Sequence, residues 1–169
     1  MAHQKKKNHN YDDNASREFI KNIFERKFGI LLKDGKHKKI DLIGIENELF
    51  GVEVEHGHWE GDFWKNDQYS YLAKLDFRTV NIPIRKQPYW DDYMGKKPNP
   101  SANLNVFVRT NIDFTQFILI RPETIKDPEK TKKTRFLANN NDVEEEWLSF
   151  KKEDVETFNL VNGEFILEP

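Results

Sequence analysis

The stretch from Lys38 to Gly57 reads Lys-Lys-Ile-Asp-Leu-Ile-Gly-Ile-Glu-Asn-Glu-Leu-Phe-Gly-Val-Glu-Val-Glu-His-Gly. Apolar residues dominate residues 40–45 and 49–54, and the polar residues 46–48 separate the two runs. Two short apolar runs on either side of a polar turn are typical of a β-hairpin. The stretch therefore predicts two antiparallel strands at the centre of the fold.

The register of this hairpin decides which side chains meet. If the turn is centred on Asn47, Asp41 lies opposite Glu53. Glu55 shares their face, because residues two apart on a strand point the same way, and Lys39 lies across from it. Burying several like charges together is unfavourable unless a cation neutralises them, so this face predicts a metal site. The same alternation also fits a hairpin with a solvent-exposed polar face, and the sequence leaves that alternative open.

The composition indicates a single globular domain. The chain has 169 residues, of which 37% are hydrophobic and 33% charged. It has no cysteine, which excludes disulfides and zinc sites built from thiolates. No apolar segment follows the basic N-terminal residues, and no apolar run is long enough to span a bilayer. We therefore expect a cytoplasmic protein without a membrane partner.

Charge is distributed unevenly, although the formal net charge is only −2. Residues 142–169 carry nine acidic and two basic side chains, whereas the rest of the chain carries 25 basic and 20 acidic ones. This segregation permits a basic binding face beside an acidic C-terminal part, although each basic cluster taken singly also fits a solvated loop. The basic clusters are Lys5–Lys7, Lys33–Lys39, Arg85–Lys86, Lys96–Lys97 and Lys126–Arg135.

Helical periodicity is clearest before the hairpin. Residues 1–12 are polar and predict a flexible tail. The helix should begin near Asp13, since apolar residues then recur at helical spacing from Phe19 to Phe28 until Gly29 ends the pattern. Glu18 lies on the first turns of this helix.

The elements beyond the hairpin predict an α/β (α+β) domain around a central mixed β-sheet flanked by helices, spanning residues 13–169. Residues 87–103 contain three prolines and predict a long surface loop, which in compact domains is often functional. The other predicted elements are a strand at 30–33, a helix at 63–76, strands at 77–84, 105–110 and 114–120, one helical turn at 147–150, and a C-terminal hairpin of 157–161 and 164–167 around Asn162-Gly163.

Glu18 on the first helix, Asp41 on one strand and the run Glu53-Val54-Glu55 on the next form an acidic pattern. Followed by a second helix, this pattern resembles the PD-(D/E)xK nuclease superfamily. The core of that superfamily is a helix, three strands, a helix and a further strand. The resemblance would cover residues 14–84 and implies a restriction-endonuclease-like core with extra C-terminal strands. By position, it makes Asp41 and Glu53 ligands of Mg²⁺, or of Mn²⁺ in its place, and Glu18 an assisting carboxylate.

Two positions depart from the superfamily pattern. Ile40 stands where the proline of the motif would be, and Glu55 stands in place of its lysine. Some restriction endonucleases are similar in carrying Glu-x-Glu here. The lysine orients or activates the attacking water, so its role would fall to another cation: Lys39 across the hairpin, or Lys65 or Lys74 on the next helix.

The resemblance and the carboxylates together predict a metal-dependent DNA endonuclease. Carboxylates suit Mg²⁺, a hard ion that keeps several waters, and the ion can activate water for attack on a phosphodiester. The catalytic residues would be Asp41, Glu53, Glu55 and Lys39, with Glu55 accepting a proton from the water. The nucleic-acid contacts would come from Lys36, Lys38, Arg85, Lys86, Trp90 and Tyr93.

Other interpretations stay open. A catalytically inactive relative could bind nucleic acid or a protein partner, and the absent motif lysine favours it. An acidic inhibitor that imitates DNA, of the kind phages use, would explain residues 142–169. His56 and His58 either act near the site or form ordinary polar surface. A homodimer is a further alternative, although no coiled-coil pattern supports it.

Overall fold

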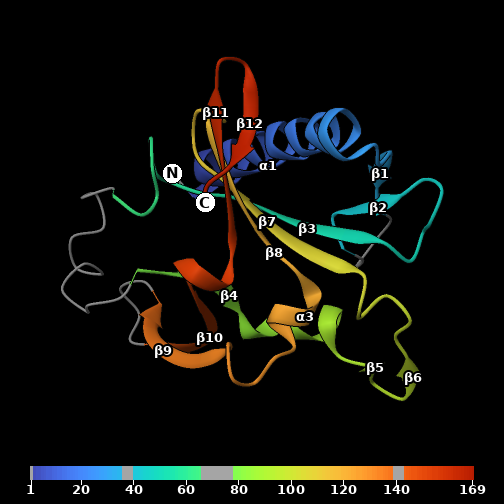
Figure 1. Ribbon diagram of the computed structural model, residues 1–169. Helices are drawn as coiled ribbons and strands as arrows, with labels where there is room; N and C mark the ends of the chain where they lie inside the picture. The colour runs from blue at the N-terminus through green and yellow to red at the C-terminus, as the bar shows by residue number, and fades with distance from the viewer. Residues whose placement is uncertain (1, 36–39, 66–77, 139–142) are drawn as a thin grey trace.

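The computed structural model describes residues 2–35, 40–65, 78–138 and 143–169 (Figure 1). Its longest described helix, α1 (Ala2–Ile23), continues into a π-helical turn, η1 (Phe24–Phe28). The continuous helix that they form ends at Gly29, as predicted, where a φ of 68° favours glycine. The other described helical segments are η3 (Ile84–Trp90), α3 (Pro122–Ile125) and η5 (Lys152–Asp154). The strands are β1 (Leu32–Asp34), β2 (Leu42–Gly44), β3 (Gly51–His56), β4 (Thr79–Pro83), β5 (Tyr93–Met94), β6 (Lys97–Pro98), β7 (Asn105–Thr110), β8 (Gln116–Ile120), β9 (Lys132–Ala138), β10 (Val143–Lys151), β11 (Glu156–Val161) and β12 (Glu164–Leu167).

A mixed sheet forms the centre of the described molecule, with seven strands in the order β1-β2-β3-β7-β8-β11-β12. Strands β3 and β7 are parallel, and the other neighbours in this sheet are antiparallel. The hairpin of β2 and β3 pairs Leu42 with Val52 and Ile43 with Gly51. This is the register expected from a turn centred on Asn47, so that prediction is confirmed.

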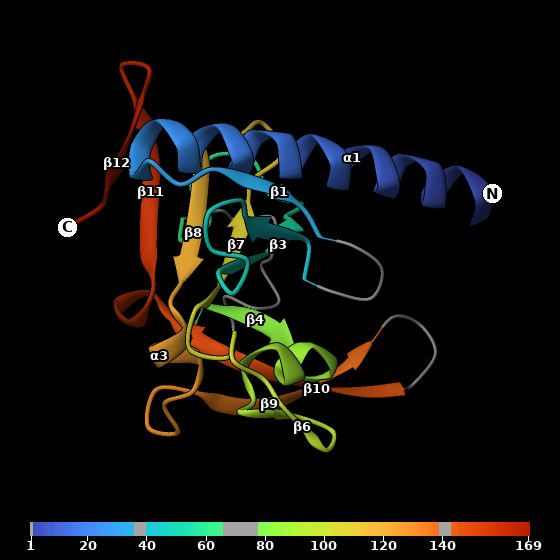
Figure 2. The ribbon, with the colours of Figure 1, turned by 90° about the vertical axis from the view of Figure 1, so that its right-hand side faces the viewer.

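Helix α1 covers one face of the central sheet. Its buried side chains Ile20 and Ile23, with Phe24 of η1, pack in one core with Val52 and Val54 of β3. This core also contains residues of the strands farther along the sheet: Val106, Val108, Phe117, Leu119, Phe158 and Phe165. In Figure 2 α1 runs across the top of the molecule, above β7 and β8. Since alternate residues of a strand point to opposite faces, Gly51, Glu53 and Glu55 face away from this core.

The opposite face of the central sheet packs against a second, three-stranded sheet in the order β4-β10-β9, seen at the bottom of Figure 2. Phe107, Ile118 and Ile120 from the central sheet share a core with Ile82 of β4 and Phe150 of β10. Trp59, Phe63, Val80, Trp90, Ile125 and Leu148 complete it. The molecule therefore has three layers: a helix, a mixed sheet and a small antiparallel sheet.

The N-terminal helix begins earlier than predicted. Helix α1 starts at Ala2, so residues 2–12 are helical rather than the tail expected from their polarity. No glycine or proline occurs between Ala2 and Phe28, and adding residues to an existing helix is much more favourable than starting one. The absence of an apolar stripe in residues 2–12 therefore does not end the helix.

Two elements that follow β3 in the chain differ from their predictions. The strand expected at 77–84 exists as β4, but β4 belongs to the small sheet, and β7 takes the place beside β3. The helical turn expected at 147–150 is wrong, because these residues lie within strand β10. Four residues are too few for periodicity to separate a helical turn from a strand, and pairing with β4 and β9 decides the matter.

The remaining predictions have mixed outcomes. The strands at 105–110 and 114–120 correspond to β7 and β8, and the C-terminal hairpin is β11–β12. Its Asn162-Gly163 turn has positive φ at both residues, 51° and 82°, as tight hairpin turns require. The loop at 87–103 is partly ordered into η3 and the β5–β6 ribbon. The helix expected at 63–76 falls mostly outside the described residues.

The acidic C-terminal part is structural. Residues 143–169 supply β10 to the small sheet and β11 and β12 to the central sheet. They are therefore integral to both layers rather than a tail. Among the described residues, no helix combines the length and the apolarity that a bilayer crossing needs.

Candidate active site

A cavity of about 230 Å³ opens beside β3, where α1, η3 and β10 approach the central sheet. The structure brings Asp41, Glu53 and Glu55 together here, as the hairpin register predicts. Basic and aromatic side chains from elements distant in sequence share the walls. The lining residues are Asp13, Arg17, Asp41, Glu53, Val54, Glu55, His56, His58, Pro83, Arg85, Lys86 and Trp147.

The hairpin positions the carboxylates through one backbone contact and the pleat of β3. Asp41 directly precedes β2, and its Oδ2 accepts a hydrogen bond of 2.9 Å from the backbone N–H of Val54. This bond ties Asp41 across the hairpin to the strand that carries Glu53 and Glu55. The neighbouring Val54 faces the α1 core, so the two glutamates face the cavity side.

Glu53 is the most buried of the three carboxylates, with 5% of the residue exposed. Burial raises the pKa of Glu53 to about 8, and the adjacent Asp41 carboxyl adds to the increase, while the charge of Lys86 opposes it. Its Oε2 atom is buried and meets no hydrogen-bond donor among the described residues. At neutral pH Glu53 therefore keeps its proton unless a further cation displaces it.

Each carboxylate also lies beside a protein cation. Lys86 Nζ of η3 is 3.3 Å from Glu53 Oε1, and Arg109 of β7 is 2.7 Å from Glu55 Oε1. Glu55 and Arg109 are direct partners across the parallel β3–β7 pair, which explains the short contact. Arg17 of α1 is 3.7 Å from Asp41. The cavity thus contains three carboxylates, each with a basic side chain beside it.

The donor set fits a hard divalent cation in part. Asp41 and Glu53 offer carboxylate oxygens, the ligands that Mg²⁺ prefers, and the buried Oε2 atoms of Glu53 and Glu55 lack hydrogen-bond partners in the described structure. Across the described ranges, no three acidic or histidine side chains are grouped as ligands of one ion. A cation held by two carboxylates and waters is compatible with both observations.

The other predicted catalytic and metal-binding residues have different outcomes. The Glu18 side chain is 68% exposed, pairs with Lys21 and does not line the cavity, so the structure does not bring it to Asp41 and Glu53. Asp13 and Arg17, on the same helix, line the cavity instead. Lys39 and Lys74 lie outside the described residues, and the exposed Lys65 does not line the cavity.

Among the predicted nucleic-acid contacts, Arg85 and Lys86 line the cavity. Tyr93 is 63% exposed on the β5–β6 ribbon. The prediction for Trp90 is wrong: it is buried, and its Nε1 donates to the Asn105 carbonyl. A polar flanking sequence suggested exposure, but the 3₁₀ helix η3 turns this ring into the core beneath it. Lys36 and Lys38 fall outside the described residues.

Sequence reasoning missed several residues of the cavity. Asp13 and Arg17 are four apart on one helix face, a spacing that could have indicated a shared surface. Arg109 and Trp147 had no local signal, because their positions depend on which strands pair with β3 and β4. The sequence predicts a cation from the hairpin or the next helix beside the acidic pair, whereas the structure supplies Lys86 from η3.

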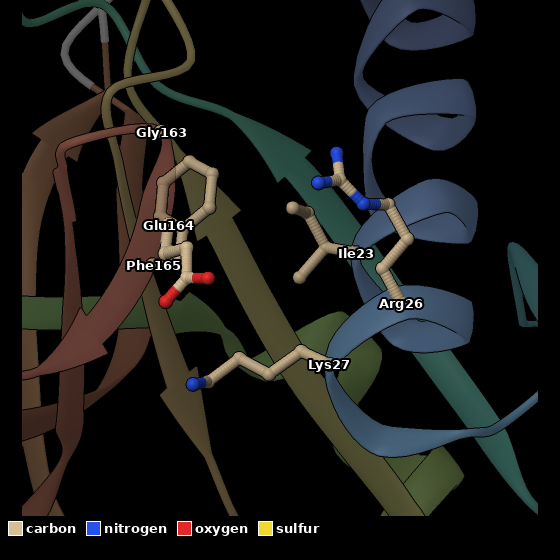
Figure 3. A pocket seen from close by; sticks show the side chains of 6 residues that line it. All are labelled: Ile23, Arg26, Lys27, Gly163, Glu164 and Phe165. Atoms are coloured by element: carbon tan, nitrogen blue, oxygen red, sulfur yellow. The ribbon is translucent and has the colours of Figure 1, made fainter.

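A second cavity of about 250 Å³ lies between the end of the N-terminal helix and the β11–β12 hairpin (Figure 3). Its lining residues are Ile23, Arg26, Lys27, Gly163, Glu164 and Phe165, and Figure 3 shows Lys27 extending from the helix toward Glu164. Only one carboxylate lines it. The cavity beside β3 is therefore the better candidate for metal-dependent chemistry.

The fold and the cavity define the class: a three-layered α/β protein with a buried carboxylate pair at a hairpin, surrounded by basic side chains. No protein family model and no curated protein matches the chain. The case for a function therefore depends on the site itself.

Proposed function

We propose that this protein is a metal-dependent DNA endonuclease that uses Mg²⁺, or Mn²⁺ in its place, to hydrolyse phosphodiester bonds. The observation that carries the proposal is Glu53, a buried carboxyl whose pKa is raised to about 8 by burial and by the adjacent Asp41, with Lys86 Nζ 3.3 Å away. A buried carboxyl with a raised pKa beside a second carboxyl is a candidate ion site, and perturbed pKa values concentrate at functional sites.

The topology supports the same proposal. Helix α1, the antiparallel strands β1, β2 and β3, and the parallel neighbour β7 follow the helix, three-strand and further-strand order of the PD-(D/E)xK core. The further strand would then be β7 rather than the strand expected at 77–84. The second helix of that core would fall in the region between β3 and β4, where residues 66–77 lie outside the described structure.

The carboxylates and the lysine of the cavity would have different roles in this reaction. Asp41 and Glu53 would hold the ion through carboxylate oxygens, after Glu53 has released its proton. When bound, the ion supplies an activated water and stabilises negative charge on the phosphate. Glu55, fixed by Arg109, would accept a proton from the attacking water. Lys86, the cation beside Glu53, would contact phosphate oxygens.

The test of this function is cleavage by the full-length protein. Supercoiled plasmid and single-stranded DNA are incubated with Mg²⁺, Mn²⁺ or EDTA, and the products are separated on gels. We expect cleavage with either metal and none in EDTA. Absence of cleavage of both substrates in both metals, by protein shown to be folded by circular dichroism, would refute the proposal.

Lys86→Met is expected to lower kcat/KM for DNA cleavage by about 100-fold, because it removes one cation from the developing phosphate charge. Lys130→Met is the matched control, since Lys130 is exposed and does not line the cavity. Steady-state kinetics on a fluorescent oligonucleotide separate the two variants. Equal rates for Lys86→Met and Lys130→Met would exclude a catalytic part for Lys86.

One observation favours a second candidate, an inactive relative that binds nucleic acid or a protein. All three carboxylates already have protein cations beside them, which reduces their need for a metal. This candidate predicts DNA or protein binding that persists in EDTA, without cleavage. The inhibitor alternative predicts binding to a protein partner that persists in EDTA, also without cleavage. Deleting residues 142–169 does not test this alternative, because the deletion removes strands from both sheets.

A further inference from the structure

Trp147 lines the carboxylate cavity, and the proposed hydrolysis does not use it. Most side chains that line this cavity are charged or are histidines, and the apolar exceptions are Val54, Pro83 and Trp147. Val54 also packs in the core beneath α1. The cavity therefore combines carboxylates and cations with one large apolar ring.

The pairing of β10 with β4 places Trp147 directly opposite Pro83. Figure 2 shows these two strands side by side below the central sheet. The neighbouring Leu148 packs in the core between the two sheets, so Trp147 points away from that core. Pro83 directly precedes η3, which contacts both strands and contributes Arg85 and Lys86 to the same cavity. The indole and these two cations therefore come from one continuous part of the cavity wall.

Internal packing explains the other described tryptophans better than it explains Trp147. Trp59 and Trp90 are each 1% exposed, and both indole N–H groups donate to protein acceptors. Trp64 is partly buried, and its indole N–H donates to the Thr157 hydroxyl. Trp147 is also only partly buried, but its Nε1 has no hydrogen-bond partner in the described part of the chain. Since a buried indole N–H is normally paired, hydrogen bonding within the protein does not account for an indole at this position.

A nucleotide has the two groups that this part of the wall suits. Its phosphate is attracted by cations such as Lys86, and its base has a π-face that stacks on aromatic side chains whatever the sequence. In a duplex the neighbouring base pairs cover both faces of a base. Stacking on a side chain therefore requires a base that is single-stranded or turned out of the duplex.

We infer that Trp147 stacks on the base of the nucleotide whose phosphate binds at Lys86, which makes single-stranded DNA the preferred substrate. The inference rests on the proposed function, because this phosphate is the one that the carboxylate site would hydrolyse. The contact selects an unpaired base and not a particular base, since all four bases stack. Trp147 is thus a specificity-determining residue that takes no part in the chemistry.

The experiment measures binding without cleavage. Full-length protein in EDTA is titrated with an oligothymidylate of about six nucleotides and with an abasic chain of the same length, in which a hydrogen atom replaces each base. The two chains carry the same phosphates, so a difference in Kd reports the bases. We expect the oligothymidylate to bind about 10-fold more tightly and to quench tryptophan emission, and the abasic chain to leave the emission unchanged. Equal Kd values, or oligothymidylate binding without quenching, overturn the inference.

Variants assign the base preference to one ring. Trp147→Leu should bring the two Kd values to within about 2-fold of each other and remove the quenching. Trp147→Phe should keep most of the preference, because a phenyl ring also stacks, but should lose the quenching with the indole. Phe28→Leu is the matched control: Phe28 is 36% exposed and does not line the cavity, so both effects should persist.

Two results with the variants would contradict the assignment. One is a base preference that survives in folded Trp147→Leu protein, and the other is quenching that survives in Trp147→Phe, a smaller change that decides the matter if the leucine variant does not fold. Neither metal nor cleavage enters these titrations. A base preference carried by Trp147 in a protein that cuts no DNA rejects only the nuclease, and DNA cleavage with equal Kd values rejects only the role of Trp147.

Discussion

Asp41→Asn is expected to abolish metal-dependent DNA cleavage while leaving the protein folded. Losing one of two carboxylate ligands removes much of the ion's stabilisation of the transition state, so the rate should fall by more than about 100-fold. Asparagine keeps an oxygen that can accept the 2.9 Å hydrogen bond from the Val54 N–H, so the hairpin should be unaffected. Cleavage of a fluorescent oligonucleotide with Mg²⁺ measures the loss.

The stability of this variant separates a site effect from misfolding. Asp41 raises the pKa of Glu53, so removing its charge should leave the metal-free protein as stable as wild type or more stable at neutral pH. Asp113→Asn is the control, because Asp113 is exposed in the β7–β8 turn. Urea unfolding is compared for all three proteins. A folded Asp41→Asn protein that cleaves DNA at the wild-type rate would place the activity elsewhere.

In EDTA, the free energy of unfolding is expected to fall as the pH rises from about 4.5 to about 8. Glu53 keeps its proton in the folded protein up to a pKa of about 8, whereas in the unfolded chain it loses the proton near its ordinary value of 4.5. Below both values the proton is bound in both states, and this contribution to stability is complete. Above the lower value the unfolded state alone gains a charge, so stability is lost until the folded pKa is passed. The full shift sets an upper limit of roughly 5 kcal/mol.

Comparison with Glu53→Gln isolates this contribution from other titrating groups. We expect the Glu53→Gln protein to lack the wild-type decline between pH 5 and pH 8. Glu46→Gln, in the exposed hairpin turn, should retain it. Urea titrations at several pH values in EDTA give the three curves. An unchanged slope in Glu53→Gln would show that Glu53 does not carry the buried proton.

Addition of Mg²⁺ should reverse the trend at the alkaline end. An ion that binds ionised Glu53 displaces the proton, so the apparent affinity should rise with pH up to about 8, and binding near pH 7 should release protons. Calorimetric titration in buffers of different ionisation enthalpy counts those protons. Binding without proton release, or equal binding by Glu53→Gln, would separate the ion from this carboxylate.

Local sequence alone determined the parts of the site that depend on short-range geometry. The turn around Asn47 sets which residues of the hairpin face each other, and the observed pairing of Leu42 with Val52 places Asp41 beside Glu53. The Asn162-Gly163 hairpin and the helix end at Gly29 follow from the same kind of constraint, because they need positive φ. Alternation along β3 then puts Glu53 and Glu55 on one face.

Only the tertiary structure decided what surrounds those carboxylates. The same alternating pattern fits an exposed hairpin, and the packing of the small sheet and η3 over this face leaves Glu53 only 5% exposed and raises its pKa. The partner of Glu55 is Arg109, 54 residues away, and it meets Glu55 because β7 pairs in parallel with β3. Lys86 and Trp90 share one short helix, yet one reaches the cavity and the other the core. Burial and long-range pairing come from the whole chain packing together, and no local spacing encodes them.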